Sequence, residues 1–135
     1  MTLASTLFWL TLTVYHEARG ESPEGQRAVA KVILNRAAWK RVDVETVVTA
    51  PKQFSCFNLG TRNPAVWIKD VLTMASVAYN IGIALDEWNA GDTLGGATHY
   101  YAIAGMEEGK PPYWSKDPDM HFIREIGGHR FFKEG

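Results

Sequence analysis

Apolar residues in the N-terminal stretch recur at helical spacing and lead to an acid. Four of them lie at steps of four, three and four: Leu3, Leu7, Leu10 and Val14. This spacing places them on one face of a helix, and the next step of three reaches Glu17. Gly20 suits the left-handed residue that ends many helices. The pattern predicts an amphipathic helix with a carboxyl group on its inward face, near its C-terminal end.

A second helix is predicted from Ser22 to about Ala38. Serine is a preferred N-cap, and proline, here Pro23, is favoured at the first helical position. The helix presents one largely apolar face, formed by Gln26, Val29, Ile33 and Ala37. Gln26 is the polar member of this face, close to Glu17 along the chain. It could orient a substrate or hydrogen-bond Glu17, or it could be a capping or packing glutamine.

Helical and extended patterns alternate in the rest of the chain. Residues 43–48 predict a short helix capped by Asp43, and residues 63–90 carry a four-three apolar repeat that predicts the central core helix. Residues 97–101 predict a short extended run. Gly127-Gly128, between residues 122–126 and 129–132, is a two-residue hairpin signal. We therefore predict an α+β, mostly α-helical single domain over residues 1–135, with a small C-terminal β-hairpin.

The amino-acid composition and net charge limit the kinds of partner that we expect. Hydrophobic residues make up 46% and charged residues 21% of the 135 residues, and the formal net charge is -1. No nucleic-acid partner is expected from this balance. Cys56 is the only cysteine, so an intramolecular disulfide is excluded, and a small buried residue is its expected role. Residues 3–14 are too short to span a bilayer and lack a preceding basic residue, so we expect no signal peptide, no stable membrane insertion and synthesis in the cytoplasm.

The two carboxylates of the stretch YHEARGE are predicted to do different work. Desolvation and the negative end of a helix dipole both raise the pKa of a carboxyl group at the position of Glu17, and a protonated carboxyl is what a general acid requires. Glu21 precedes a helix N-terminus, which favours its ionised form, so it is expected to fix Arg19 or the turn. The alternative for Glu17 is a buried structural carboxylate paired with Arg19 or a histidine.

Aromatic, hydroxyl and amide side chains supply candidate sugar-binding positions, since rings stack on apolar sugar faces and polar groups bond sugar hydroxyls. The substrate-binding candidates are Gln26, Phe54, Ser55, Tyr100, Tyr101 and Trp114. The loop at residues 53–58 could equally be an ordinary surface loop, and paired tyrosines are often half core.

The same residues carry a family resemblance. YHEARGESPEGQRAVAKVILNR (15–36), QFS (53–55), GGATHYY (95–101) and IGGHRFFK (126–133) follow in the order of the SleB/CwlJ-type cell wall hydrolase family, which this chain strongly resembles. The resemblance implies a compact, mostly helical, lysozyme-like domain that cleaves the glycan strands of peptidoglycan. We expect neither a cofactor nor a metal. Its characterised members include lytic transglycosylases, and the glutamate that opens EARGE, here Glu17, is the family's catalytic acid. A catalytic domain beginning at Met1 looks more like a phage endolysin, made in an infected host and acting on the bacterial cell wall; we expect a monomer.

Three functions stay open beside the predicted lytic transglycosylase. A hydrolytic muramidase would need a second carboxylate or its equivalent. A zinc-dependent amidase could draw ligands from the four histidines, His16, His99, His121 and His129, although His16-Glu17 lacks the second histidine of the helical zinc motif. A non-catalytic glycan-binding module would explain the aromatic loops, but it has no need of an acid on a buried helix face.

Overall fold

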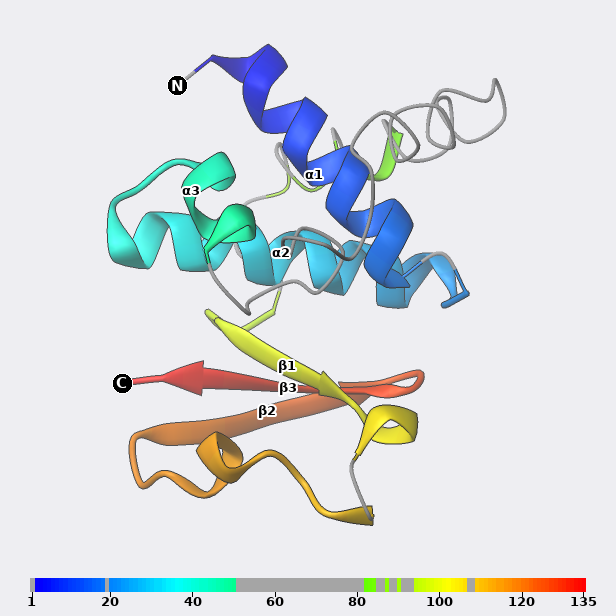
Figure 1. Ribbon diagram of the computed structural model, residues 1–135, viewed down its shortest axis with the longest axis vertical. Coiled ribbons are helices and arrows are strands. Elements are labelled where there is room, and N and C mark those ends of the chain that lie inside the picture. The colour runs from blue at the N-terminus through cyan, green and yellow to red at the C-terminus, as the bar shows by residue number, and fades with distance from the viewer. Residues whose placement is uncertain are drawn as a thin grey trace.

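The protein packs helices against one face of a small antiparallel sheet (Figure 1). This computed structural model describes residues 2–18, 20–50, 82–84, 87, 90, 94–106 and 109–135. The helices are α1 (Leu3–Ala18), α2 (Pro23–Lys40) and α3 (Val44–Thr49), and the strands are β1 (His99–Ala102), β2 (Met120–Ile126) and β3 (His129–Glu134), with the short 3-10 helices η2 (Ile103–Gly105) and η4 (Tyr113–Lys116) between β1 and β2. The predicted α+β, mostly helical class is confirmed.

Helix α1 buries the end of its predicted apolar stripe. Leu10 and Val14 are fully buried, whereas Leu3 is 47% exposed, so the stripe enters the core only from the middle of the helix onward. Threonines are buried here as well. The hydroxyls of Thr6 and Thr13 donate to the backbone carbonyls four residues earlier, at 3.1 and 2.7 Å. These bonds satisfy the hydroxyls of Thr6 and Thr13 within the helix itself, whereas the buried Thr11 hydroxyl has no partner among the described residues.

Helix α2 begins as predicted and runs through the centre of the described structure. The Ser22 hydroxyl oxygen accepts from the Gly25 N–H at 3.2 Å, and the helix ends at Arg41, which has a left-handed φ of 57°. Every residue from 28 to 33 is buried. A helix buried on all sides needs partners on all sides, and α2 has α1 and α3 on one side and the sheet on the other (Figure 1).

The two remaining helix predictions differ in outcome. Helix α3 is capped as predicted, because Asp43 Oδ1 accepts from the Thr46 N–H at 2.8 Å. Most of the predicted helix over residues 63–90 lies outside the described residues. Within it, residues 82–84 are helical, and Ile83 and Ala84 are buried.

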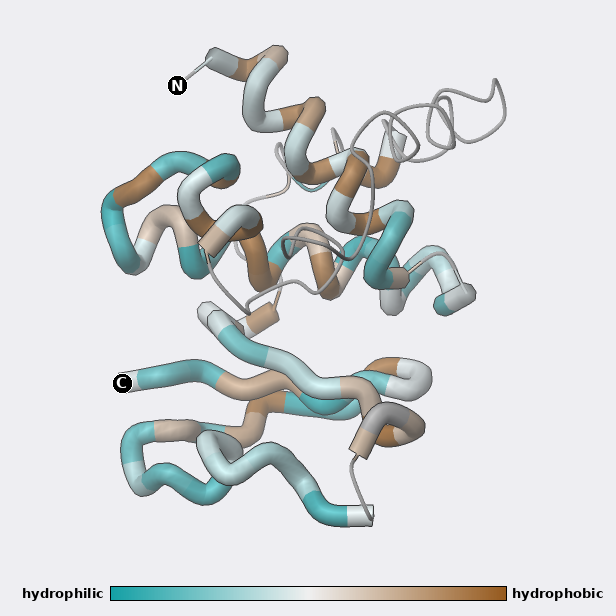
Figure 2. Tube along the Cα trace, in the orientation of Figure 1, coloured by the Kyte–Doolittle hydropathy of each residue, from teal (hydrophilic) through white to brown (hydrophobic). Residues whose placement is uncertain are grey.

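The sheet has strand order β1-β3-β2, and both strand pairs are antiparallel. The predicted Gly127-Gly128 hairpin joins β2 to β3. The extended run predicted at residues 97–101 overlaps the third strand, β1, which begins at His99. Helix α2 holds this strand at its start, since Asn35 Nδ2 donates to the Ala97 carbonyl at 3.1 Å and Arg36 Nε donates to the Thr98 carbonyl at 2.8 Å. Apolar segments concentrate along α1 and α2, while hydrophilic residues dominate the connection that carries η4 (Figure 2).

Across the described ranges, no helix combines the length and the hydropathy that a membrane crossing requires.

Candidate active site

Glu17 lies in the last turn of α1, where it is half-buried beside the buried Ala18. The chain then turns tightly, because the Glu21 N–H donates to the Ala18 carbonyl at 2.9 Å. This bond holds the end of α1 close to the start of α2, and we call the place where these two helices meet the junction. The position of Glu17 at a helix C-terminal end agrees with the sequence prediction.

Glu21 joins this junction to the β2–β3 hairpin. Its Oε1 lies 3.1 Å from His129 Nδ1. The same carboxylate faces the hairpin turn so closely that a Cβ built on Gly127 would lie 3.0 Å from Oε2, and one on Gly128 would lie 3.1 Å from Oε1. The turn can approach Glu21 because both of its residues lack a side chain. The carboxylate of Glu21 therefore links the start of α2 to the β2–β3 hairpin.

His129 is the hairpin residue nearest to this carboxylate, and its ring is buried at 4% exposure. Burial lowers the pKa of His129, and the negative charge of Glu21 opposes that shift only in part. The ring is therefore mainly neutral at neutral pH. Because Nδ1 makes no aligned hydrogen bond to any described residue, its 3.1 Å approach to Glu21 is a close polar contact rather than a charged ion pair.

Gln26 and Tyr100 are the predicted substrate-binding residues that the structure brings to this region. Gln26 is buried at 4% exposure, and its Nε2 donates to the Glu21 carbonyl at 3.2 Å. Its Oε1 is buried, with no hydrogen-bond donor among the described residues. Tyr100 is half-buried, with its ring edge-on to His129 at a centroid distance of 5.1 Å. Glu21, Gln26, His129 and Tyr100 thus form one connected group, which we call the junction cluster.

Tyr101 and Trp114 lie on the other face of the sheet. Tyr101 is 8% exposed, stacks on Phe132 at 5.7 Å, and its hydroxyl accepts from Arg130 Nη1 at 3.1 Å. Trp114 packs edge-on against Phe132 at 5.5 Å. These two predicted sugar-binding residues therefore belong to an aromatic cluster of their own, apart from the junction cluster.

Three predicted residues, Arg19, Phe54 and Ser55, lie outside the described residues.

The four histidines of the zinc alternative are spread over four elements: His16 in α1, His99 in β1, His121 in β2 and His129 in β3. Within the part of the chain that the structure describes, no three histidine, cysteine or carboxylate side chains gather as a metal site would require.

Sequence reasoning named His129 only as a possible zinc ligand and missed its contact with Glu21. The hairpin signal at Gly127-Gly128 was visible, and so was an acid at Glu21. Nothing in the local sequence indicated that the two would meet, since they lie at opposite ends of the chain. The contact is a consequence of packing the sheet beside the start of α2.

Comparisons with known proteins agree with this architecture. The sequence profile of the cell wall hydrolase family matches residues 20–132, a range that begins three residues after Glu17. The catalytic domain of the germination-specific lytic transglycosylase SleB from Bacillus anthracis is similar, with a TM-score of 0.69 and 26% identity over 98% of this chain and 97% of that one. The catalytic domain of the Bacillus cereus SleB protein has a TM-score of 0.67 and 26% identity over 98% of this chain and 93% of that one. Among curated proteins, none matches.

Proposed function

Because the chain belongs to the cell wall hydrolase family, we propose that it cleaves the glycan strand of peptidoglycan as a lytic transglycosylase, with Glu17 as the general acid and base. The family membership confirms the resemblance read from the sequence. The similar Bacillus anthracis domain is a lytic transglycosylase, and the likeness extends over 98% of this chain. Origin in a phage, a monomeric state and action at the cell wall stay predictions.

The observation that carries this proposal is that the two carboxylates of the junction, Glu17 and Glu21, lie in different environments. Glu21 is held against the hairpin turn and His129, so it supports the junction. Glu17 is half-buried at the C-terminal end of α1, where partial desolvation and the helix dipole both favour a protonated carboxyl group. A single acid suffices for a transglycosylase, whereas a hydrolase usually works with a carboxylate pair.

The reaction proceeds in two proton transfers. Protonated Glu17 donates its proton to the glycosidic oxygen between N-acetylmuramic acid and N-acetylglucosamine, and that C–O bond breaks through an oxocarbenium-like transition state. The Glu17 carboxylate then removes the proton from the 6-hydroxyl of the same muramic acid. The freed oxygen bonds to C1 and closes a 1,6-anhydro ring. Glu17 ends protonated, as it began, and no water is consumed.

Gln26 and Tyr100 are the best-placed of the predicted substrate-binding residues. The buried Gln26 Oε1 has no donor among the described side chains and backbone, and leaving an acceptor unpaired costs free energy. An N–H of a sugar N-acetyl group would supply the missing donor. Tyr100 presents a half-exposed phenol in the same cluster.

Substitution of Glu17 tests the assignment. Glu17→Gln keeps the shape of the side chain and removes the acid, so we expect the rate of glycan cleavage to fall by about 10²- to 10⁴-fold. Glu45→Gln is the matched control, because Glu45 is an exposed carboxylate on α3; its rate should equal that of the unsubstituted protein. Wild-type cleavage by Glu17→Gln would exclude Glu17 as the acid.

Mass analysis of the released muropeptides tests the reaction type. Anhydromuramic ends are expected. Reducing muramic acid ends would establish a hydrolytic muramidase instead. Reducing glucosamine ends would show that the other glycosidic bond of the strand is the one cleaved. Freed peptides would establish an amidase, and binding without any released fragment would establish a glycan-binding module.

A further inference from the structure

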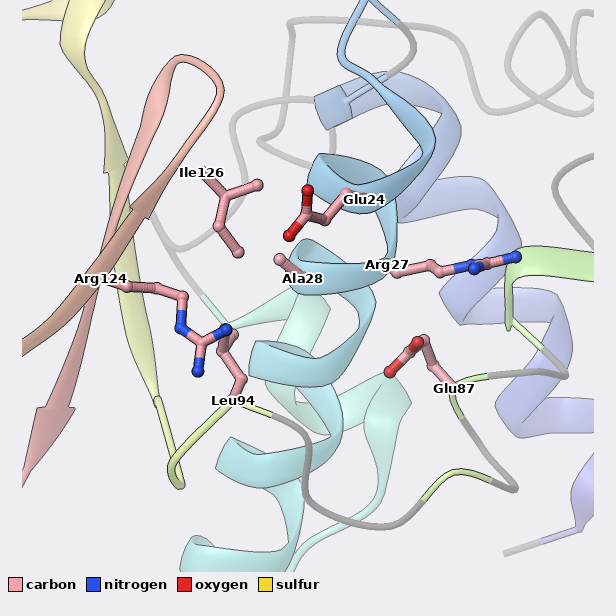
Figure 3. Close-up of a pocket in the computed structure, with 7 residues that line it drawn as sticks. All are labelled: Glu24, Arg27, Ala28, Glu87, Leu94, Arg124 and Ile126. Carbon is pink, nitrogen blue, oxygen red and sulfur yellow. The ribbon is translucent and has the colours of Figure 1, made fainter.

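A pocket of about 260 Å³ lies between α2 and β2, beside the junction cluster (Figure 3). One wall comes from α2, where Glu24, Arg27 and Ala28 share a helix face at spacings of three and four. The opposite wall comes from Arg124 and Ile126, alternate residues of β2 that face the helices. The pocket therefore combines side chains of opposite charge with the apolar side chains of Ala28, Leu94 and Ile126.

The pocket is a neighbour of the proposed catalytic region rather than a part of it. Ile126 directly precedes Gly127, the hairpin residue that touches the Glu21 carboxylate. Glu24 follows Glu21 by three residues and lies in the first turn of α2. A substituent on a glycan held at the junction would reach the pocket over a short distance along the start of α2.

Four charged residues line the pocket, and the side chains of two of them, Glu24 and Arg124, are open to a ligand. Arg27 is not, because its side chain points away from Glu24 and Arg124 (Figure 3). Glu87 is not, since its carboxylate lies 3.7 Å from the buried Lys31 Nζ, which also donates to the Glu87 carbonyl at 2.7 Å. Glu24 and Arg124 are both exposed, and within the described ranges neither side chain forms a hydrogen bond or an ion pair. Figure 3 shows Glu24 reaching from α2 and Arg124 from β2 into the same space, with Ala28 between them.

We propose that this pocket binds an amino-acid end group of the peptidoglycan stem peptide, one that carries a free ammonium and a free carboxylate. The ammonium faces Glu24 and the carboxylate faces Arg124. This subsite rests on the proposed function, because the stem peptide branches from the muramic acid whose C1 is attacked.

The chemistry of the walls favours this ligand over other cell-wall groups. A purely anionic ligand, such as a phosphate, would meet the carboxylate of Glu24, and a purely cationic one would meet Arg124. A sugar ring is usually held by aromatic stacking and neutral hydrogen-bonding groups, and the described residues that line the pocket include no aromatic side chain. At about 260 Å³, the pocket is below the usual range for drug-sized ligands, which starts near about 300 Å³, and suits one amino-acid residue.

Binding of synthetic peptides tests the proposal without any glycan cleavage. The probe is a stem tripeptide that ends in a diamino acid with a free side-chain ammonium and carboxylate. A second probe has the side-chain amine acetylated, and a third has that carboxylate amidated. Nuclear magnetic resonance titration of the full chain should show each modification weakening binding about fivefold, the scale of a partly exposed charge pair.

Substitutions then assign each charge to its partner. Glu24→Gln should lose the discrimination between amine and acetylated amine, and keep that between carboxylate and amide. Arg124→Gln should show the reverse. Lys116→Ala removes an exposed positive charge on η4 and should keep both discriminations.

Equal affinity of the unsubstituted protein for all three probes, or no binding of any of them, would overturn the proposal. So would variants that keep the wild-type pattern of discrimination. The titration is independent of turnover, so loss of the glycan-cleaving function and loss of the subsite would be seen in separate experiments.

Discussion

At the scale of single residues, His129 shows how burial and a neighbouring charge compete. The ring lies under the sheet's helix-facing side with only 4% exposure. Desolvation disfavours the charged imidazolium, and the nearby Glu21 carboxylate favours it. Burial is the larger effect, so the pKa of His129 is lowered despite an anion at 3.1 Å. The neutral ring can then pack edge-on against Tyr100.

Removing the charge of Glu21 should lower the pKa of His129 further. Glu21→Gln keeps the side-chain volume near the hairpin turn but deletes the one interaction that raises this pKa. A histidine titration followed by nuclear magnetic resonance measures the shift. Glu125→Gln is the control, because Glu125 pairs with Arg130 at 3.0 Å in a partly exposed contact; the pKa of His129 should not change there. An unchanged or raised pKa in Glu21→Gln would contradict the contact described.

The sequence predicted those residues of the site whose role is local. The caps at Ser22 and Asp43 and the position of Glu17 follow from spacing and side-chain chemistry within a few residues. Tyr100 and Tyr101 were treated together as substrate-binding candidates, although successive residues of a strand point to opposite faces. Their separation could have been read from the extended run itself. The meeting of Glu21 with His129 could not, because it depends on how the sheet packs against α2.

At the scale of elements, the β2–β3 turn is shaped by the acid that it touches. Gly127 has a φ of 55°, in the left-handed region where a side chain is strained. A Cβ there would also lie 3.0 Å from Glu21 Oε2. We expect Gly127→Ala to reduce the free energy of unfolding by about 2 to 3 kcal/mol, measured by urea denaturation, because strain and steric contact add.

Substitution of Gly109 separates the cost of backbone strain from the cost of steric contact with Glu21. Gly109 has a φ of 72°, yet nothing lies within 4 Å of a Cβ built on it. Gly109→Ala should therefore cost only the strain, about 1 kcal/mol. In a Glu21→Ala background, where the contact is gone, Gly127→Ala should fall to the same cost. Equal costs for the two single variants would show that the hairpin does not press against Glu21.

Element predictions succeeded where the signal was local and strong. The hairpin was predicted from two adjacent glycines, α1 from its apolar spacing, and α2 and α3 from their N-caps. The left-handed residue expected at Gly20 is not found, because the φ of Gly20 is not positive. The four-three repeat predicts a central core helix over residues 63–90, and most of that range lies outside the described residues. Among the described elements, α2 occupies the centre. Its central place follows from contacts on all sides, including the sheet, and a helical repeat alone does not indicate how many partners a helix will have.

At the scale of the whole molecule, His99 lies where the sheet, α2 and η4 meet. Its ring is 5.3 Å from that of Trp114, and its Nδ1 is 2.9 Å from the Thr98 hydroxyl. That hydroxyl oxygen also accepts from the Glu134 N–H at 3.0 Å, so its proton is available to an unprotonated Nδ1. Thr98 is in turn held to α2 by the bond from Arg36 to its carbonyl. A neutral His99 ring can therefore accept the Thr98 hydroxyl proton in a hydrogen bond at the place where β1, α2 and η4 meet.

The free energy of unfolding should depend on pH because of the lowered pKa of His99. Burial, followed by the positive charges of Arg36 and Lys40, lowers the pKa of His99 to about 4. The pKa of a histidine in the unfolded chain is about 6.5. Between these two values the unfolded chain binds the proton more tightly, so the free energy of unfolding should fall as the pH falls from 6.5 to 4 and should not depend on this group above 6.5. Because the ring is partly exposed, we expect a loss of about 1 to 2 kcal/mol.

Urea denaturation of the unsubstituted protein and of His99→Gln, at pH 7 and pH 4.5, isolates this contribution. The lowered pKa of His129 gives a loss of the same sign, but both proteins carry it, so it cancels in the difference. The variant should lose less stability on acidification by about the amount assigned to His99. Parallel losses in the two proteins would mean that the ring is already protonated in the folded state, and the packing of β1 between α2 and η4 would then have to accommodate a charge.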